Sequence, residues 1–289
     1  MVYMDNINKL TILEKTDLLF FDVGLGQSIF VYPHSHPEYG MLIDCGHTEG
    51  FHPIDFLIKK NFIKDTLSNL TLTNYDHDHF SGLPYLRSKV KINTVSLASN
   101  LASSEIKELK AEATEALEHL CYVKDTYIHP IQNYVPPFTK RIFHLQKHHL
   151  DQYDTNNLSQ VVFVEHLGTV ICVPGDIEQK GWVALLKEEP TIKDWLRKTN
   201  VFIASHHGRE NGYHADVFTY CKPECIIISD KGIVHETQKD MSALYGTHVT
   251  GNGVPFNGNL RKILTTRNDG HLWLQLLPVG SRTYRNFGD

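Results

Sequence analysis

The chain has 289 residues, of which 41% are hydrophobic and 21% are charged, and these values are typical of a globular protein. Its 28 basic residues against 33 acidic ones give a formal net charge of −5, which argues against a strongly basic face for binding nucleic acid duplexes. No apolar run approaches the roughly 18 residues of a membrane-spanning helix, and residues 1–16 do not show the layout of a signal peptide. We therefore expect a cytoplasmic globular protein with no membrane segment.

Apolar runs and turn residues alternate along the chain and predict a mixed α/β fold. Strands are expected at 18–22, 27–32, 40–44, 69–73, 92–98, 141–146, 159–165, 169–173, 200–204, 225–229, 261–266 and 271–277, and helices at 53–61, 102–122, 178–188, 191–198 and 213–220. The 102–122 segment has the clearest helical pattern, because Ile106, Leu109 and Ala113 recur at helical spacing. We expect one domain over residues 1–289, with an inserted helical subdomain around 100–135.

The segment from Thr73 to Gly82 gathers polar side chains directly after an apolar run. Asn74, Asp76 and Asp78 are two residues apart, so on an extended or tightly looped backbone their side chains point the same way. His79 enters from the next turn. Burying these groups without a cation would cost several kcal/mol per unpaired charge. The pattern indicates a metal site, although a solvated acidic turn before a helix would show the same residues.

Two later strand ends carry residues of the same kind. The apolar run 170–173 is followed by a glycine-led turn that presents Asp176, and the run 201–204 leads into Ser205, His206 and His207. Ligands that are far apart in sequence, but that all lie at strand ends, can meet on one edge of a sheet. These segments favour the metal site over the acidic turn, with Asp176 placed to bridge two ions.

The combined motifs resemble the metallo-β-lactamase superfamily, and within it the ComEC-like branch of competence proteins. The residues that carry the resemblance lie at 20–27, 41–46, 74–82, 156–159, 175–176, 206–208 and 266–270. The resemblance covers residues 18–277, nearly the whole chain. It implies an αββα sandwich, in which two mixed sheets are flanked by helices, and a metal-dependent hydrolase.

The chain departs from the family at the first part of its signature. The first signature histidine is Asn74 here, the second position is Asp76, and Asn157 stands near the place of a third histidine in other branches. The implied metal ligands are Asn74, Asp76, Asp78, His79, Asp176 and His206, with His206 preferred to His207. This oxygen-rich set favours Mn²⁺, with Zn²⁺ close behind, and one or two ions. Alternatively, the missing imidazole leaves the protein poor in metal, and it acts as a catalytically degenerate binding or scaffold subunit of a multiprotein system.

A phosphodiester is the expected substrate, because metal ions stabilise the negative charge of its transition state and activate a hydroxide for in-line attack. Asp78 and His207 are the candidate catalytic residues, with His207 either protonating the leaving oxygen or binding a phosphate oxygen. Ser205, Arg209 and Asn157 are the candidate substrate contacts. The resemblance points to a nuclease or phosphodiesterase acting on nucleic acid or nucleotides. The acidic net charge favours single strands or small nucleotides over duplexes.

The five cysteines are odd in number, which predicts reduced thiols rather than a disulfide framework. Cys221 and Cys225 have no further zinc-type ligands beside them in the sequence. We expect both to pack as small buried side chains.

Overall fold

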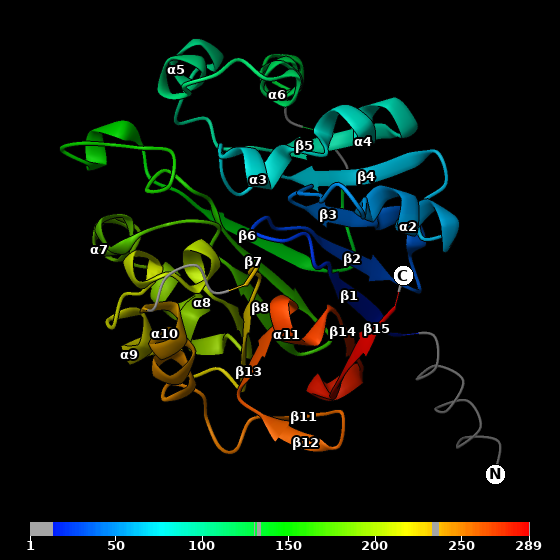
Figure 1. Ribbon diagram of the computed structural model, residues 1–289, viewed down its shortest axis with the longest axis vertical. Coiled ribbons are helices and arrows are strands. Elements are labelled where there is room, and N and C mark those ends of the chain that lie inside the picture. The colour runs from blue at the N-terminus through cyan, green and yellow to red at the C-terminus, as the bar shows by residue number, and fades with distance from the viewer. Residues whose placement is uncertain (1–13, 130, 132–133, 233–236, 289) are drawn as a thin grey trace.

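The computed structural model describes residues 14–129, 131, 134–232 and 237–288. The first thirteen residues, for which the sequence predicts no signal peptide, lie outside this part of the chain. Two large mixed sheets pack face to face, with helices on their outer sides (Figure 1). This arrangement confirms the αββα sandwich expected from the sequence.

The first sheet has seven strands in the order β15-β14-β1-β2-β3-β4-β5. Their bounds are β1 Thr16–Phe20, β2 Ile29–Pro33, β3 Met41–Ile43, β4 Thr66–Thr71, β5 Lys91–Ser96, β14 His271–Leu276 and β15 Arg282–Phe287. Strands β3, β4 and β5 run parallel, and the other neighbours are antiparallel.

The second sheet has six strands in the order β13-β10-β9-β8-β7-β6. Their bounds are β6 Thr139–Phe143, β7 Val161–His166, β8 Thr169–Val173, β9 Val201–Ile203, β10 Cys225–Ile228 and β13 Ile263–Thr265, and a separate hairpin joins β11 Val254–Phe256 to β12 Asn259–Arg261. Strands β8, β9, β10 and β13 are parallel, so their carboxyl ends lie at one edge of the sheet.

The α-helices are α2 Pro53–Lys59, α3 His77–Phe80, α4 Leu83–Lys89, α5 Ser103–Leu109, α6 Glu115–Thr126, α7 Gln179–Glu188, α8 Ile192–Lys198, α9 Val217–Tyr220, α10 Thr237–Gly246 and α11 Thr266–Asp269. Figure 1 shows α2, α4 and α6 on the side of the first sheet and α7 to α10 on the side of the second.

The single helix predicted at 102–122 is wrong, because the structure has two helices there. Lys110 ends α5 with an extended backbone, and Thr114 caps α6 by accepting a hydrogen bond from the peptide N–H of Leu117 at 3.1 Å. A threonine hydroxyl satisfies a free N–H better at a helix start than in a helix interior. The break also interrupts the apolar stripe, because Ile106 and Leu117 are buried whereas Leu109 and Ala113 are exposed.

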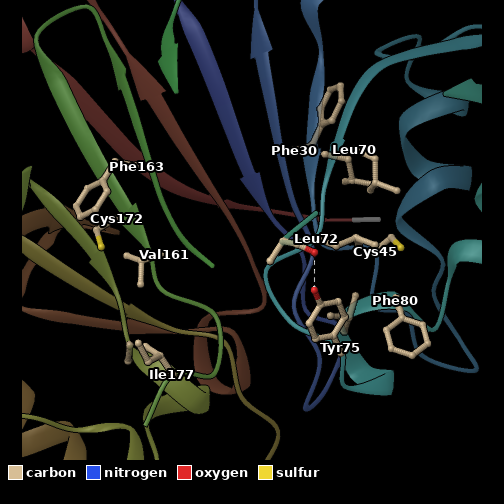
Figure 2. Close-up of a cluster of buried hydrophobic side chains, with 14 of the residues drawn as sticks. Phe30, Cys45, Leu70, Leu72, Tyr75, Phe80, Val161, Phe163, Cys172 and Ile177 are labelled. Carbon is tan, nitrogen blue, oxygen red and sulfur yellow. Dashed lines mark hydrogen bonds between the residues drawn. The ribbon is translucent and has the colours of Figure 1, made fainter. Parts of the chain in front are cut away.

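Side chains alternate along the central strands between two apolar layers. Leu18, Val162 and Ile171 face the space between the sheets, whereas their neighbours point outward under the helices. Figure 2 shows outward-facing side chains in two groups, with Phe30 and Leu70 on one side and Phe163 and Cys172 on the other. This burial on both faces explains why the strands read as continuous apolar runs in the sequence.

The five cysteines are free and buried, in agreement with the prediction of reduced thiols. Cys221 and Cys225 pack among apolar side chains in the core. Among the residues that the structure describes, no helix is long and apolar enough to cross a membrane.

A lysine joins the two sheets at their open edge. Lys140 on β6 donates hydrogen bonds to Asn69 Oδ1 at 2.9 Å, to Thr71 Oγ1 at 3.2 Å and to Ser96 Oγ at 2.6 Å, all on the first sheet. Its hydrogen-bond partners are neutral, and burial lowers the pKa of the Lys140 ammonium to about 8. The ammonium thus connects the sheets at the cost of desolvating its charge.

We expect Lys140 to make the stability of the protein depend on pH. Between the folded pKa of about 8 and an unfolded value of roughly 10.4, the unfolded chain binds more protons, so stability rises with pH in this window. Urea unfolding from pH 7.5 to 10 should therefore show the wild type gaining on the order of 1–3 kcal/mol relative to Lys140→Met. The control is Lys91→Met, at an exposed position of β5. A wild-type curve parallel to that of Lys140→Met would contradict the expectation.

Candidate metal centre

The loop after β4 and the short helix α3 present Asp78 and His79. The peptide N–H of His79 donates to the Asp76 carbonyl at 2.9 Å, and the peptide N–H of Cys45 donates to the His79 carbonyl at 2.8 Å. These bonds join the loop to the chain that follows β3. They hold the His79 side chain fully buried at the sheet edge.

Two glycines allow this loop to lie against its neighbours. A Cβ added at Gly26 or at Gly46 would come within 3.0 Å of the Asp78 carbonyl oxygen, closer than real Cβ atoms come. The peptide N–H of Gln27 donates to the same carbonyl at 3.3 Å. Neither Gly26 nor Gly46 has a positive φ, so backbone conformation does not require glycine at these positions. Glycine is required there because the chain segments approach too closely for a Cβ.

A left-handed turn directly after β9 presents the two adjacent histidines. His206, His207 and Gly208 have φ values of 49°, 54° and 72°, a conformation that is strained for residues with a Cβ. The peptide N–H of His206 donates to the Gly175 carbonyl at 3.1 Å, which joins this turn to the one after β8. The two imidazoles diverge, with ring centroids 6.3 Å apart and planes inclined by 62°.

Four side chains converge where these loops meet. One ligand-type atom from each of Asp78, His79, Asp176 and His207 lies within 4.8 Å of the others, in a group found among the described residues. His79 Nε2 is 3.1 Å from Asp176 Oδ1. His207 Nε2 is 3.1 Å from Asp78 Oδ2 and 3.5 Å from Asp176 Oδ1. Three strand ends thus contribute to one cluster, as the sequence predicts.

In both His79 and His207, the hydrogen bond made by Nδ1 fixes which ring nitrogen carries the proton. His79 Nδ1 donates to the Asp44 carboxylate at 2.8 Å, and His207 Nδ1 donates to the Ser229 carbonyl oxygen at 2.8 Å. A neutral imidazole carries one N–H, so both Nε2 atoms then present lone pairs to the carboxylates. His79 Nε2 is buried without a hydrogen-bond partner. This arrangement needs a proton or a metal ion between the groups, and the four residues therefore fit a divalent cation.

The pKa shifts in the cluster have the same origin. Burial alone would lower the pKa of His79. Asp176 and two other nearby carboxylates outweigh this effect and raise the pKa to well above its usual range. Burial also lowers the pKa of His207, and Asp176 and Asp78 outweigh this effect and raise it to about 10. Burial raises the pKa of Asp176, whereas His79 and His207 lower it to well below its usual range. The cluster thus stabilises positive charge beside its carboxylates.

Asp44 supports the cluster from behind. Its fully buried carboxylate accepts hydrogen bonds from the Gln27 side chain at 2.7 Å, from the Thr73 peptide N–H at 2.7 Å and from the Thr73 hydroxyl at 2.6 Å, in addition to His79. Four donors on one carboxylate fix both its orientation and that of the His79 ring. Asp44 itself has a left-handed φ of 58°.

Two of the predicted ligands, Asn74 and Asp76, have protein partners, and Asp76 is not part of the four-residue cluster. Asn74 donates to Asn156 Oδ1 at 3.0 Å. The Asp76 carboxylate accepts hydrogen bonds from the Lys110 ammonium and, at 2.6 Å, from the Thr155 hydroxyl.

His206, which the sequence favours as a ligand over His207, also lies outside the four-residue cluster. Its Nε2 is 3.0 Å from Arg209 Nη1, and its Nδ1 is 3.3 Å from Glu178 Oε1. Burial lowers the pKa of His206. The left-handed turn is the reason for the difference, because it directs His207 rather than His206 toward Asp176.

The three candidate substrate contacts differ in their surroundings. The Ser205 hydroxyl is buried and accepts from Trp182 Nε1 at 3.1 Å. The Asn157 side chain is also buried, accepting from the Gly181 peptide N–H at 2.7 Å and donating to Asp154. Arg209 is only half-buried and has its guanidinium beside His206.

Asp44 and Lys110 were absent from the sequence-based set of site residues. The sequence does indicate a role for Asp44, since this residue ends an apolar strand and precedes Gly46 in the motif at 41–46. No such indication exists for Lys110, because it lies inside a segment whose pattern predicts an uninterrupted helix.

No family model matches the chain. Over 235 residues it is 27% identical to ComE operon protein 3 of Bacillus subtilis strain 168, covering 72% of this chain and 27% of that protein. The chain thus spans about a quarter of the length of this relative.

Among solved structures, the chain is similar to CmlA, a diiron β-hydroxylase from Streptomyces venezuelae, with a TM-score of 0.50, 10% identity, and coverage of 90% of this chain and 54% of that one. The metallo-β-lactamase fold protein YhfI from Bacillus subtilis has a TM-score of 0.46 and 9% identity, covering 88% and 97% of the two chains. Such likenesses concern the fold alone. The sandwich architecture and the match to ComE operon protein 3 agree with the resemblance to the metallo-β-lactamase superfamily and its ComEC-like branch.

We expect Gly46→Ala to destabilise the protein, because the new methyl group would collide with the Asp78 carbonyl. Urea unfolding should show a loss of about 1–3 kcal/mol, as for other overpacked sites. Gly50→Ala is the matched control, since a Cβ there meets nothing within 4 Å, and it should change stability by less than about 0.5 kcal/mol. Equal stabilities of the two variants would show that the loop does not depend on this contact.

Proposed function

We propose that this chain is a metal-dependent hydrolase that cleaves phosphodiesters in nucleic acid or nucleotides. The observation that carries the proposal is the set of facing groups at the sheet edge. His79 Nε2 and His207 Nε2 face the Asp78 and Asp176 carboxylates, while the Nδ1 atoms are held by Asp44 and a backbone carbonyl. A surface cluster of acidic groups would not need two imidazoles with fixed tautomers.

The four residues would hold one ion through two imidazole nitrogens and two carboxylate oxygens. Their two negative charges balance one divalent cation. Because the set has equal numbers of nitrogen and oxygen donors, both Mn²⁺ and Zn²⁺ suit it. When bound, such an ion supplies Lewis-acid polarisation of the scissile phosphate and activates water at neutral pH.

We assign the two histidines roles opposite to those expected from the sequence. His207 is proposed as the ligand, since its Nε2 lies within 3.5 Å of both carboxylates. Arg209 is proposed as a contact for the substrate phosphate, because it is half-exposed, and His206 as the residue that positions it, because His206 Nε2 accepts from the Arg209 guanidinium at 3.0 Å. The guanidinium is suited to this role by its planar set of donors.

The choice of substrate rests on the ComEC-like resemblance and on charge. With a net charge of −5, the chain has no excess of basic residues for tight duplex binding. We therefore propose single-stranded nucleic acid or small nucleotides as substrates ahead of intact duplexes.

Alanine variants of the two adjacent histidines test the role assignment. With bis(4-nitrophenyl) phosphate and added Mn²⁺, His207→Ala should lose at least about 100-fold in kcat/KM, since even residues that only orient ligands cost 10–100-fold when removed. His206→Ala should lose less, and it should retain bound metal. The control is His36→Ala, since this histidine is exposed and its side-chain hydrogen bond joins it to Glu38, which is also exposed.

A larger loss in His206→Ala than in His207→Ala, accompanied by loss of the ion, would contradict the assignment. Absence of both bound metal and phosphodiesterase activity in the wild type would instead favour the metal-poor binding or scaffold subunit.

A further inference from the structure

The carboxylate of Asp76 already has a cation beside it. Lys110, at the carboxyl end of α5, donates to Asp76 Oδ1 and also to Thr155 Oγ1 at 3.2 Å, and the Thr155 hydroxyl donates to Asp76 Oδ1 at 2.6 Å. The side chains of Lys110 and Asp76 are 20% and 29% exposed, so the pair is largely shielded from water. The ammonium, the carboxylate and the hydroxyl form a closed group.

Asp76 is two residues before Asp78, so this group lies on the loop that leads into the proposed metal site. The peptide N–H of His79 donates to the Asp76 carbonyl, which ties both segments to the same turn of α3. Lys110 thus connects the helical segment between β5 and β6 to the loop that carries Asp78 and His79.

The polar side chains near Asp76 in the sequence and around Asn156 also have hydrogen-bond partners. Asn74 Oδ1 accepts from the Tyr75 peptide N–H, and Asn74 Nδ2 donates to Asn156. Asn156 in turn donates to Glu178 Oε1 at 3.3 Å. Within the described ranges, the one group of metal-type side chains is the cluster of Asp78 and its three partners. A second divalent ion would find few free oxygen ligands and an ammonium of like charge.

We propose that Lys110 takes the place of a second divalent ion: the chain holds one ion, and the Lys110 ammonium binds the substrate phosphate beside it. This inference rests on the proposed function and names a residue that binds its substrate. Of the three ammonium protons, two are directed to Asp76 and Thr155. The third has no hydrogen-bond partner among the described residues and would be donated to a phosphate oxygen. Asp76 keeps the amine charged and in place by its ion pair.

Metal content and phosphate binding test the proposal without a turnover assay. Wild-type protein loaded with excess Mn²⁺ and then desalted should contain one ion per chain by elemental analysis. Asp76→Asn and Lys110→Met should also contain one ion. Calorimetric titration of the Mn²⁺-loaded proteins with inorganic phosphate should show binding weakened about tenfold in Lys110→Met and little changed in Lys110→Arg.

Lys107→Met is the matched control, since Lys107 lies on the same helix and pairs with the exposed Glu118. It should bind phosphate as the wild type does. Circular dichroism at matched temperature should show every variant folded, and Lys110→Arg keeps the test valid if Lys110→Met unfolds.

Two ions in the wild type, with one lost in Asp76→Asn, would overturn the proposal and make Asp76 a metal ligand. Equal phosphate affinity in Lys110→Met and the wild type, or no phosphate binding by the wild type, would also overturn it. A wild type with one ion and the expected phosphate binding, but no phosphodiesterase activity, would contradict the proposed function instead.

Discussion

Four hydrogen-bond donors converge on the buried carboxylate of Asp44, and the geometry of the candidate metal centre depends on them. They come from the turn after β1, from the end of β4 and from the His79 ring. A buried carboxylate with this many donors is costly to disturb, because each lost bond leaves a polar group unsatisfied in the interior. Asp44 therefore fixes the relative positions of two loops and the tautomer of one imidazole.

The sequence predicts the position of the site well, because its signals are local. Apolar runs end at β4, β8 and β9, and polar residues follow each of them at once. Parallel neighbours place such ends at one edge of a sheet, so convergence of Asp78, Asp176 and a histidine follows from the order of elements. The sandwich itself follows from strands that are buried on both faces.

The sequence cannot decide what depends on contacts between distant residues. Which of two adjacent histidines faces the carboxylates is set by a left-handed turn, and that turn is held by Gly175 and Ser229. In the same way, the segment predicted as one helix is divided, because α5 ends at Lys110 and Thr114 caps the start of α6. The Lys110 side chain, at this break, contacts Asp76. Strands β11, β12 and β15 and helices α3, α4, α10 and α11 are also absent from the sequence-based assignment.

In our account, two different cations balance the carboxylates around the candidate metal centre. One divalent ion would balance Asp78 and Asp176, whereas Lys110 already balances Asp76. Under our proposal, a chain with Asn74 in place of a histidine would still offer four ligands to one ion. The proposal also gives the helical segment between β5 and β6 a part in the site.

The most direct test of the account is the location of the ion in a crystal grown with Mn²⁺, determined from anomalous scattering. The account predicts a single anomalous peak at roughly 2.0–2.3 Å from the Nε2 atoms of His79 and His207 and from carboxylate oxygens of Asp78 and Asp176. A peak bound instead by Asp76 and His206, or no peak in well-ordered density at this edge, would contradict it.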